Sequence, residues 1–116
     1  MLFRSFDARQ GISTGISAQD RALTVRRALE PKAGPDDFII PGHVLPLAAR
    51  PDGLAERQGH TEGAVELARL AGLLPAAVMS EVLTPEGQMA RGAQLQAFAA
   101  RLGCRIVAIE QLLHTR

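Results

Sequence analysis

The sequence predicts an α/β layered fold in which helices flank a mixed β-sheet. Two observations support this fold class. Apolar runs typical of strands alternate along the chain with segments whose apolar residues recur at helical spacing. Glycine, proline and short polar residues separate these segments, as they do at turns and helix ends. The length of 116 residues allows one domain, residues 1–116, with one modest core.

The first half of the chain predicts two strands with a helix between them. Residues 3–7 alternate between apolar and polar side chains, as a half-buried strand does. After a Gly/Ser/Thr loop at 11–17, Ser17 is the predicted N-cap of a helix. Residues 41–49 read as a turn that enters an apolar strand. The apolar stripe of the helix comprises Ala18, Ala22, Val25 and Leu29.

The second half predicts two longer helices and further strands. One helix begins near residue 60 and ends before Gly72. An apolar strand at 76–83 leads through a turn to a short strand at 88–90. A helix between Gly92 and Gly103 precedes a strand at 105–109 and a final helical turn at 110–113. The apolar stripes of the two helices comprise Ala64, Leu67, Ala68 and Ala71, and Leu95, Phe98, Ala99 and Leu102.

Composition argues against several classes of function. A net charge of +1 and the lack of Trp and Tyr argue against a nucleic-acid binder, which needs basic patches or stacking platforms. Cys104 is the one cysteine, which excludes an intrachain disulfide. No apolar run is long enough for a signal peptide or a membrane span, so we expect a cytoplasmic protein without a membrane partner.

The strongest candidate site is the hexapeptide at residues 57–62, where a polar loop gives way to a helix. A helix N-terminus carries unpaired N–H groups and attracts anions. Arg57 could add a bidentate phosphate donor, Thr61 a hydroxyl that caps the helix or binds the anion, and His60 a metal ligand or proton carrier. We interpret this stretch as a phosphate-and-metal corner. The alternative is an ordinary capped helix start whose Arg and His are solvated.

Three further residues have both a functional and a structural interpretation. The loop around Thr14 could hold a phosphate through backbone N–H groups, or it could be a simple strand-to-helix turn. His43, at the mouth of a strand, could be a general acid or base, or a half-buried histidine with a backbone partner. Glu81, inside an apolar run, either points to solvent or works in a site, because an unpaired buried carboxylate is costly.

Several blocks of the sequence together resemble one family, 3,4-dihydroxy-2-butanone 4-phosphate synthase (DHBP synthase). The blocks are residues 11–21 (GISTGISAQDR), 41–47 (PGHVLPL), 57–62 (RQGHTE), 80–81 (SE) and 89–91 (MAR). They stand in the family's order and near its spacing, and the resemblance covers nearly the whole chain. Any one block alone would be a weak signal.

The resemblance implies the family's fold and its reaction, the conversion of ribulose 5-phosphate to 3,4-dihydroxy-2-butanone 4-phosphate and formate in riboflavin biosynthesis. It implies Mg²⁺ or Mn²⁺ as cofactor and a homodimer with active sites at the subunit interface. His60 would be the metal ligand, and His43 and Glu81 would be catalytic. The implied substrate-binding residues are Arg57, Gly59, His60, Thr61 and Glu81, with Thr14 near the phosphate.

Two departures from the family pattern bear on activity. The family carries an N-terminal acidic loop with a Glu for the metal and an Asp for the substrate, and this sequence starts after it. Ile40 stands where the family has Arg. A single His makes a poor magnesium site, because that ion prefers an oxygen-rich shell. We therefore expect the chain alone to bind metal weakly and to turn over little or no substrate.

Three functions are therefore to be separated. The first is a metal-dependent, lyase-type synthase that is incomplete as given. The second is a non-catalytic phosphate-binding or dimerisation module derived from that enzyme. The third is a small structural α/β domain without a ligand.

Overall fold

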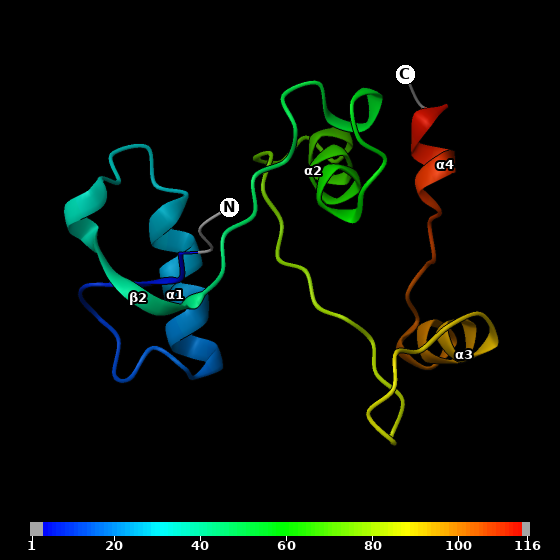
Figure 1. The fold of residues 1–116 in the computed structure, drawn as a ribbon, viewed down its shortest axis with the longest axis horizontal. Helices are drawn as coiled ribbons and strands as arrows, with labels where there is room; N and C mark the ends of the chain where they lie inside the picture. Colours follow the sequence, from blue (N-terminus) through cyan, green and yellow to red (C-terminus); the bar gives the residue numbers. More distant parts are fainter. Residues whose placement is uncertain (1–3, 115–116) are drawn as a thin grey trace. The chain divides into compact units, whose positions relative to one another are not determined.

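The computed structural model describes residues 4–114, and the chain folds as two compact units, one up to Leu47 and one from Ala48 (Figure 1). Phe3, at the start of the first predicted strand, lies outside the described residues. Across residues 4–114 the helices are too short or too polar to cross a membrane. The single domain expected for the chain stays a prediction.

The first unit is a two-stranded antiparallel sheet packed against one helix. Strand β1 (Phe6–Ala8) pairs with strand β2 (Phe38–Val44), and the register shifts between Phe6 and Asp7. Helix α1 (Ala18–Ala28) contacts both strands. A single 3-10 turn, η1 (Pro35–Asp37), leads directly into β2. The first unit thus follows the predicted order of strand, helix and strand.

The predicted apolar stripe of α1 is correct only in part, because Ala22 and Val25 are half-buried. Ala18 and Leu29 are exposed, whereas Asp20 and Thr24 are the buried residues of the helix. Thr24 can be buried because its hydroxyl oxygen accepts the backbone N–H of Ala8 at 3.0 Å. Buried polar groups need such partners, and here they also join the helix to β1.

The second unit is built around helix α2 (His60–Leu70). The helix contacts a 3-10 turn, η2 (Gly53–Ala55), and the short helix α4 (Ile109–Leu113). Leu54 of η2 and Leu112 of α4 are buried, at 1% and 5% exposure. These contacts form the small apolar core of the second unit.

The predicted stripe of α2 is correct only in part. Ala68 is buried as expected, but Leu67 and Ala71 are exposed. Glu62 and Glu66 are buried in their place. The apolar residues recur at helical spacing as predicted, but the buried positions of the helix include the two carboxylates.

Helix α3 (Ala93–Leu102) begins and ends where glycines predict. Gly92 is its N-cap, and Gly103 ends it in the left-handed conformation at φ +65°. Gly72 follows α2 in the same conformation, at φ +69°. The ends of helices were therefore predicted more reliably than their buried faces.

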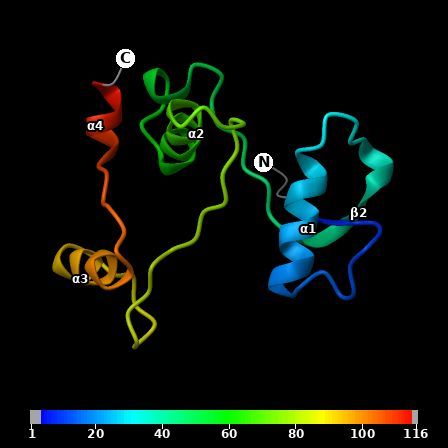
Figure 2. The same cartoon turned by 180° about the vertical axis from the view of Figure 1, so that it is seen from behind.

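None of the strands predicted at 76–83, 88–90 and 105–109 forms. Residues 76–83 and 105–108 run outside any helix or strand, and Ile109 already begins α4 (Figure 2). A strand needs a neighbouring backbone for its N–H and C=O groups. Among the described residues these runs find only the bridge between Leu83 and Met89 across a turn. The prediction of strands here is therefore wrong for this chain.

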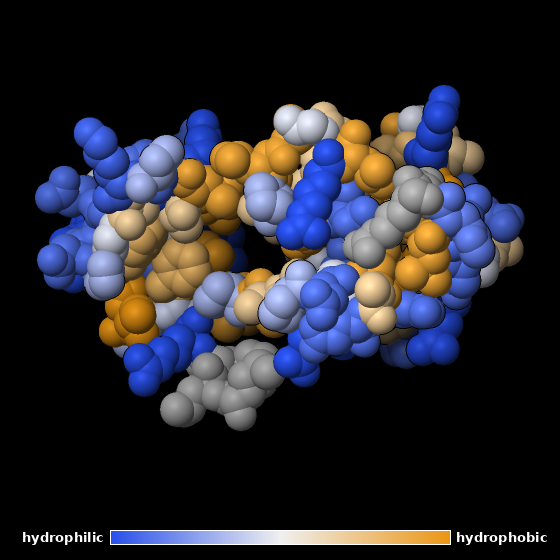
Figure 3. Space-filling model, turned by 90° about the horizontal axis from the view of Figure 1, so that it is seen from above, coloured by the Kyte–Doolittle hydropathy of each residue, from blue (hydrophilic) through white to orange (hydrophobic). Residues whose placement is uncertain are grey.

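Many apolar side chains remain at the surface, and apolar residues, in orange, show on the face in Figure 3. Large examples in the second unit are Leu73, Leu74, Val78 and Ile106, each more than half exposed. Exposed apolar surface of this kind is typical of an interaction site.

Candidate functional site

In the first unit His43 lies against a buried carboxylate. Its ring Nδ1 is 2.7 Å from Oδ2 of Asp7, and its backbone N–H donates to Oδ1 of the same residue at 2.9 Å. The Asp7 side chain is 3% exposed and the His43 side chain 36%. Strand pairing brings the two together, since Asp7 belongs to β1 and His43 to β2. His43 is thus half-buried, and a side chain is its ring's partner.

The Asp7 carboxylate is kept ionised by these contacts. Burial raises its pKa, but the hydrogen bonds from the His43 backbone and ring, together with the charge of that ring, outweigh burial. The pKa of Asp7 is therefore lowered from its ordinary value. An ionised carboxylate accepts hydrogen bonds and donates none.

Gly15 is required beside this pair. Its φ of +88° is a conformation that glycine adopts easily. A Cβ built on Gly15 would overlap Oδ2 of Asp7 and lie 2.9 Å from Nδ1 of His43. The loop backbone can approach the pair only because this position has no side chain.

The loop that carries Thr14 is organised by Asp20 of α1. Oδ2 of Asp20 accepts the backbone N–H groups of Ser13 and Gly15 and the Ser13 hydroxyl, at 2.8–3.2 Å. The Ser13 hydroxyl contributes most to lowering the pKa of Asp20. The Ser17 hydroxyl oxygen in turn accepts the N–H of Asp20, which confirms the predicted cap. Thr14 itself is exposed.

In the second unit Arg57 is paired with the buried Glu62. Nη1 of Arg57 lies 3.2 Å from Oε2 of Glu62, and the backbone N–H of Arg50 donates to Oε1 at 3.1 Å. The Glu62 side chain is 1% exposed, whereas the Arg57 side chain is 58% exposed. The guanidinium is therefore anchored at one edge while most of it faces solvent.

Glu62 is held ionised in the same way as Asp7. Burial raises its pKa, but the N–H of Arg50, its own backbone N–H and the charges of Arg57 and Arg50 outweigh burial. Its pKa is therefore lowered from the ordinary value. Acidic residues in the first helical turn are also favoured by the helix dipole.

The start of α2 brings the other predicted residues of this stretch together. Gly59 is the N-cap, and His60 and Thr61 are the first two helical residues. Thr61 therefore lies inside the helix, so its predicted capping role is wrong. A Cβ on Gly59 would lie 2.5 Å from Oε2 of Glu62 and 2.9 Å from Nη1 of Arg57, so a larger residue here would have to shift this ion pair.

The structure does not supply a metal cluster around His60. Across the described residues 4–114, no group of three or more His, Cys, Asp or Glu side chains could hold a metal ion. Glu81 is exposed in the extended run after α2, and no described contact joins it to His60. The described donor set therefore does not fit a magnesium ion, which needs several oxygen ligands.

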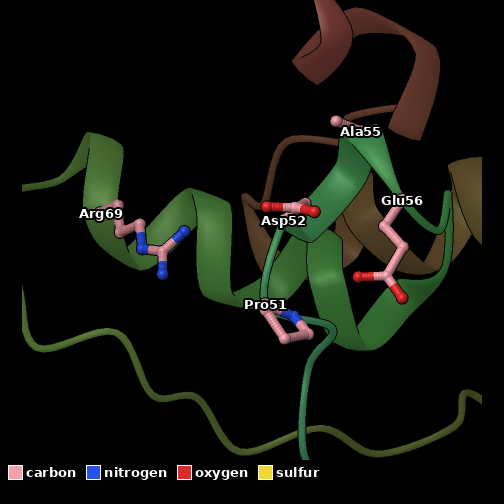
Figure 4. A pocket seen from close by; sticks show the side chains of 5 residues that line it. All are labelled: Pro51, Asp52, Ala55, Glu56 and Arg69. Atoms are coloured by element: carbon pink, nitrogen blue, oxygen red, sulfur yellow. The ribbon is translucent and has the colours of Figure 1, made fainter.

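A hollow beside α2 is separate from these groups. It is lined by Pro51, Asp52, Ala55, Glu56 and Arg69 (Figure 4). None of the predicted site residues lines it. Two carboxylates against one guanidinium make it a poor site for a phosphate.

Comparison with protein families decides what this chain is related to. The family model described as 3,4-dihydroxy-2-butanone 4-phosphate synthase matches residues 2–115. The chain belongs to this family. The resemblance drawn from the sequence blocks is thereby confirmed, and riboflavin biosynthesis is the family's context.

Curated relatives of the DHBP synthase family are similar over nearly all of this chain but much longer. The riboflavin biosynthesis protein RibBA of Aquifex aeolicus is 52% identical over 97% of this chain and 28% of its own length. The DHBP synthase of Bordetella pertussis is 50% identical over 93% of this chain and 47% of its own length. The chain thus spans half or less of these relatives.

Solved DHBP synthase structures confirm the expected α/β fold class. The Candida albicans synthase has a TM-score of 0.89 at 48% identity, over 94% of this chain and 56% of that one. RibBX, a two-domain synthase from A. baumannii, has a TM-score of 0.91 at 47% identity, over 97% and 33%. A synthase in complex with two magnesium ions has a TM-score of 0.79 at 41% identity, over 93% and 56%.

Two carboxylates of this chain were not predicted from the sequence. Asp7 holds His43, and Glu62 holds Arg57. Asp7 is 36 residues before His43, and only the strand pairing brings it close. Glu62 was part of the 57–62 block, but its partnership with Arg57 was not foreseen. The available signal was an acidic residue in the first turn of a helix that follows an arginine.

Proposed function

We propose that this chain supplies part of a DHBP synthase active site, which converts D-ribulose 5-phosphate to 3,4-dihydroxy-2-butanone 4-phosphate and formate. The observation that carries the proposal is that two solvent-accessible basic side chains, His43 and Arg57, are each held by a buried carboxylate. Proton transfer and phosphate binding both depend on side chains fixed in one orientation. The family match supplies the substrate class.

Arg57 binds the substrate phosphate in this proposal. Its guanidinium is anchored by Glu62 and still presents N–H donors to solvent. The first backbone N–H groups of α2, at His60 and Thr61, add donors and the positive end of the helix dipole. Gly59 lets the loop backbone pass close to the ion pair. Thr14, in the first unit, is proposed near the phosphate from the family resemblance.

His43 and Glu81 carry protons in this proposal. Taking a proton from a carbon beside a carbonyl requires a base, and an oriented imidazole suits that role near neutral pH. Glu81 is exposed in the extended run after α2, and a carboxylate is a group that can accept and return a proton. We assign both roles from the match of these residues to the family.

His60 is proposed as a metal ligand, with Mg²⁺ or Mn²⁺ as the ion. The described residues hold no group of three or more possible ligands, so in this proposal further oxygens come from polypeptide outside the described residues. The proton transfers proposed for His43 and Glu81 and the phosphate binding proposed for Arg57 are carried out by side chains of this chain. We also propose a homodimer in the cytoplasm.

The incomplete ligand set specifically favours a second candidate function. Without the oxygen ligands, Arg57 and the start of α2 still form an anion-binding element. The chain would then be a non-catalytic phosphate-binding or dimerisation module derived from the synthase.

One experiment separates the candidates. The chain is expressed alone and with the N-terminal half of a family member, and formate release from ribulose 5-phosphate is measured with Mg²⁺. The synthase is supported if formate is released only when the added half is present. This release should be lost in Arg57→Ala and retained in Arg69→Ala. Arg69 is a matched control because it also pairs with a buried glutamate of α2, Glu66, at 3.8 Å.

The other outcomes are equally informative. No formate with the added half, but phosphate binding that depends on Arg57, supports the binding module. No formate and no phosphate binding contradict both and leave a structural domain.

A further inference from the structure

The orientation of His43 is determined by more than a single hydrogen bond. Both oxygens of the Asp7 carboxylate are used on this one residue, Oδ1 by its backbone N–H and Oδ2 by its ring. The backbone carbonyl of His43 accepts from Nη1 of Arg21 at 3.1 Å. The residue is thus fixed at its N–H, its C=O and one ring nitrogen.

Two glycines let the backbone approach Asp7 closely. A Cβ on Gly42 would overlap the backbone of Phe6 and Asp7 and lie 2.7 Å from Cγ of Asp7. A Cβ on Gly15 would overlap Oδ2 from the other side. The carboxylate is 3% exposed, so water does not compete for its oxygens. Three chain segments thus surround the pair: β1, the loop at Gly15, and β2.

This geometry specifies which ring nitrogen carries the proton. Oδ2 of an ionised carboxylate can only accept, so Nδ1 at 2.7 Å must be the donor. In the neutral imidazole the other nitrogen, Nε2, is then unprotonated. No hydrogen bond of Nε2 is found among residues 4–114, and about a third of the side chain is exposed.

We infer that Asp7 is a positioning residue that holds His43 in the Nδ1–H tautomer and leaves Nε2 as its proton-accepting atom. The catalytic use of that atom rests on the proposed synthase function. When Nε2 takes a proton from substrate, the ring becomes an imidazolium that still donates Nδ1–H to Asp7. The carboxylate stabilises this charge and keeps its own charge unchanged.

The tautomer can be measured on the 116-residue chain without substrate. Long-range ¹H–¹⁵N correlation of the histidine rings, at a pH well above the ordinary histidine pKa, distinguishes Nδ1–H from Nε2–H. His60 and His114 are internal references in the same spectrum. The expected result is the Nδ1–H pattern for His43, and an Nε2–H pattern would overturn the inference.

Asp7→Asn tests whether the carboxylate is the cause. The amide oxygen can keep the backbone N–H of His43, but the NH₂ group then faces Nδ1, which must become an acceptor. We expect loss of the Nδ1–H signal and appearance of Nε2–H. Asp37→Asn is the matched control in the same unit, because Asp37 also accepts a backbone N–H, from Gly34 at 2.8 Å, but does not contact His43.

Each outcome decides the inference. An unchanged His43 tautomer in Asp7→Asn shows that Asp7 does not set it. If Asp7→Asn does not fold, the wild-type spectrum decides alone. An Nδ1–H tautomer in a chain whose complemented form makes no formate contradicts the proposed synthase and leaves the positioning role intact.

Discussion

The guanidinium of Arg57 lies 3.2 Å from the carboxylate of Glu62, a residue five positions later whose side chain is 1% exposed. The pair joins an exposed cation to a buried anion at the first turn of α2. The buried partner restricts the exposed one, so an arriving phosphate meets a guanidinium that has already lost rotamer freedom.

We predict that Arg57→Ala weakens binding of inorganic phosphate about tenfold or more, since a hydrogen bond to a charged group is stronger than a neutral one. Arg57→Lys should recover the charge but not the planar, bidentate contact. Titration of the ¹⁵N-labelled chain with phosphate measures both. Equal affinities of wild type and Arg57→Ala would remove this residue from the anion site.

Glu62 should make the second unit sensitive to acid. Its pKa in the folded chain is lowered from the ordinary value of 4.5, so its contribution to stability is present above that value and is lost as the pH falls below it. Thermal unfolding of Glu62→Gln should depend less on pH between about 7 and 3 than that of wild type.

Glu110→Gln is the control for this pH dependence, because Glu110 is exposed on α4. It should follow the wild-type curve. Parallel curves for wild type and Glu62→Gln would show that the carboxylate of Glu62 is not stabilised by folding.

Gly15→Ala should destabilise the first unit by about 2 kcal/mol or more. A left-handed backbone costs a residue with a Cβ about 1–2 kcal/mol, and crowding of a packed site adds about 1–3 kcal/mol. The added carbon would also displace Asp7 from His43. Urea denaturation monitored on first-unit amides measures the change.

Gly34→Ala is the matched control for Gly15→Ala. No atom lies within 4 Å of a Cβ built there, and its φ is negative. A change within about 0.5 kcal/mol is expected. Equal effects of the two substitutions would contradict the crowding argument.

His43→Gln should lower kcat of the complemented synthase about 10²- to 10⁴-fold, the range that general acid–base groups contribute. KM should change little, because the proposed phosphate contacts lie elsewhere in the chain. Asp7→Asn should act in the same direction, and Asp37→Asn should leave kcat as it is. Unaltered formate release in His43→Gln would exclude this imidazole as a proton carrier.

The isolated chain should self-associate. Leu73, Leu74, Val78 and Ile106 are each more than half exposed, and apolar surface of this extent favours association. Size-exclusion chromatography with light scattering should show a dimer or larger species that persists in sulfate, which strengthens apolar contacts. A uniform monomer would count against both this prediction and the proposed homodimer.

Local chemistry predicted the helix ends well. Ser17 caps α1 through its hydroxyl, and Gly92 and Gly103 stand at the two ends of α3, as their sequence neighbourhoods predict. The strands at 76–83 and 105–109 were not predicted correctly, because a strand depends on a partner that its own sequence does not specify.

The residues of the candidate site were predicted in type but not in environment. His43 and Arg57 were selected for their chemistry, and their carboxylate partners became visible only in the structure. The buried faces of the helices were predicted incorrectly for a related reason. Thr24 and Glu62 are buried, although apolar side chains were expected to face inward. A polar residue with a satisfied hydrogen bond can be buried, and composition patterns cannot show which residue will find one.

The two anchored basic side chains, His43 and Arg57, differ in how their partnerships are made. Arg57 and Glu62 are five residues apart and need one turn of helix, whereas His43 and Asp7 are 36 residues apart and need the three-residue strand β1 to stay paired with β2. The orientation of the imidazole therefore depends on the tertiary pairing of β1 with β2, whereas that of the guanidinium depends on a local helix start. A substitution that disrupts the strand pairing would release His43 from Asp7 and would not act directly on the contact between Arg57 and Glu62.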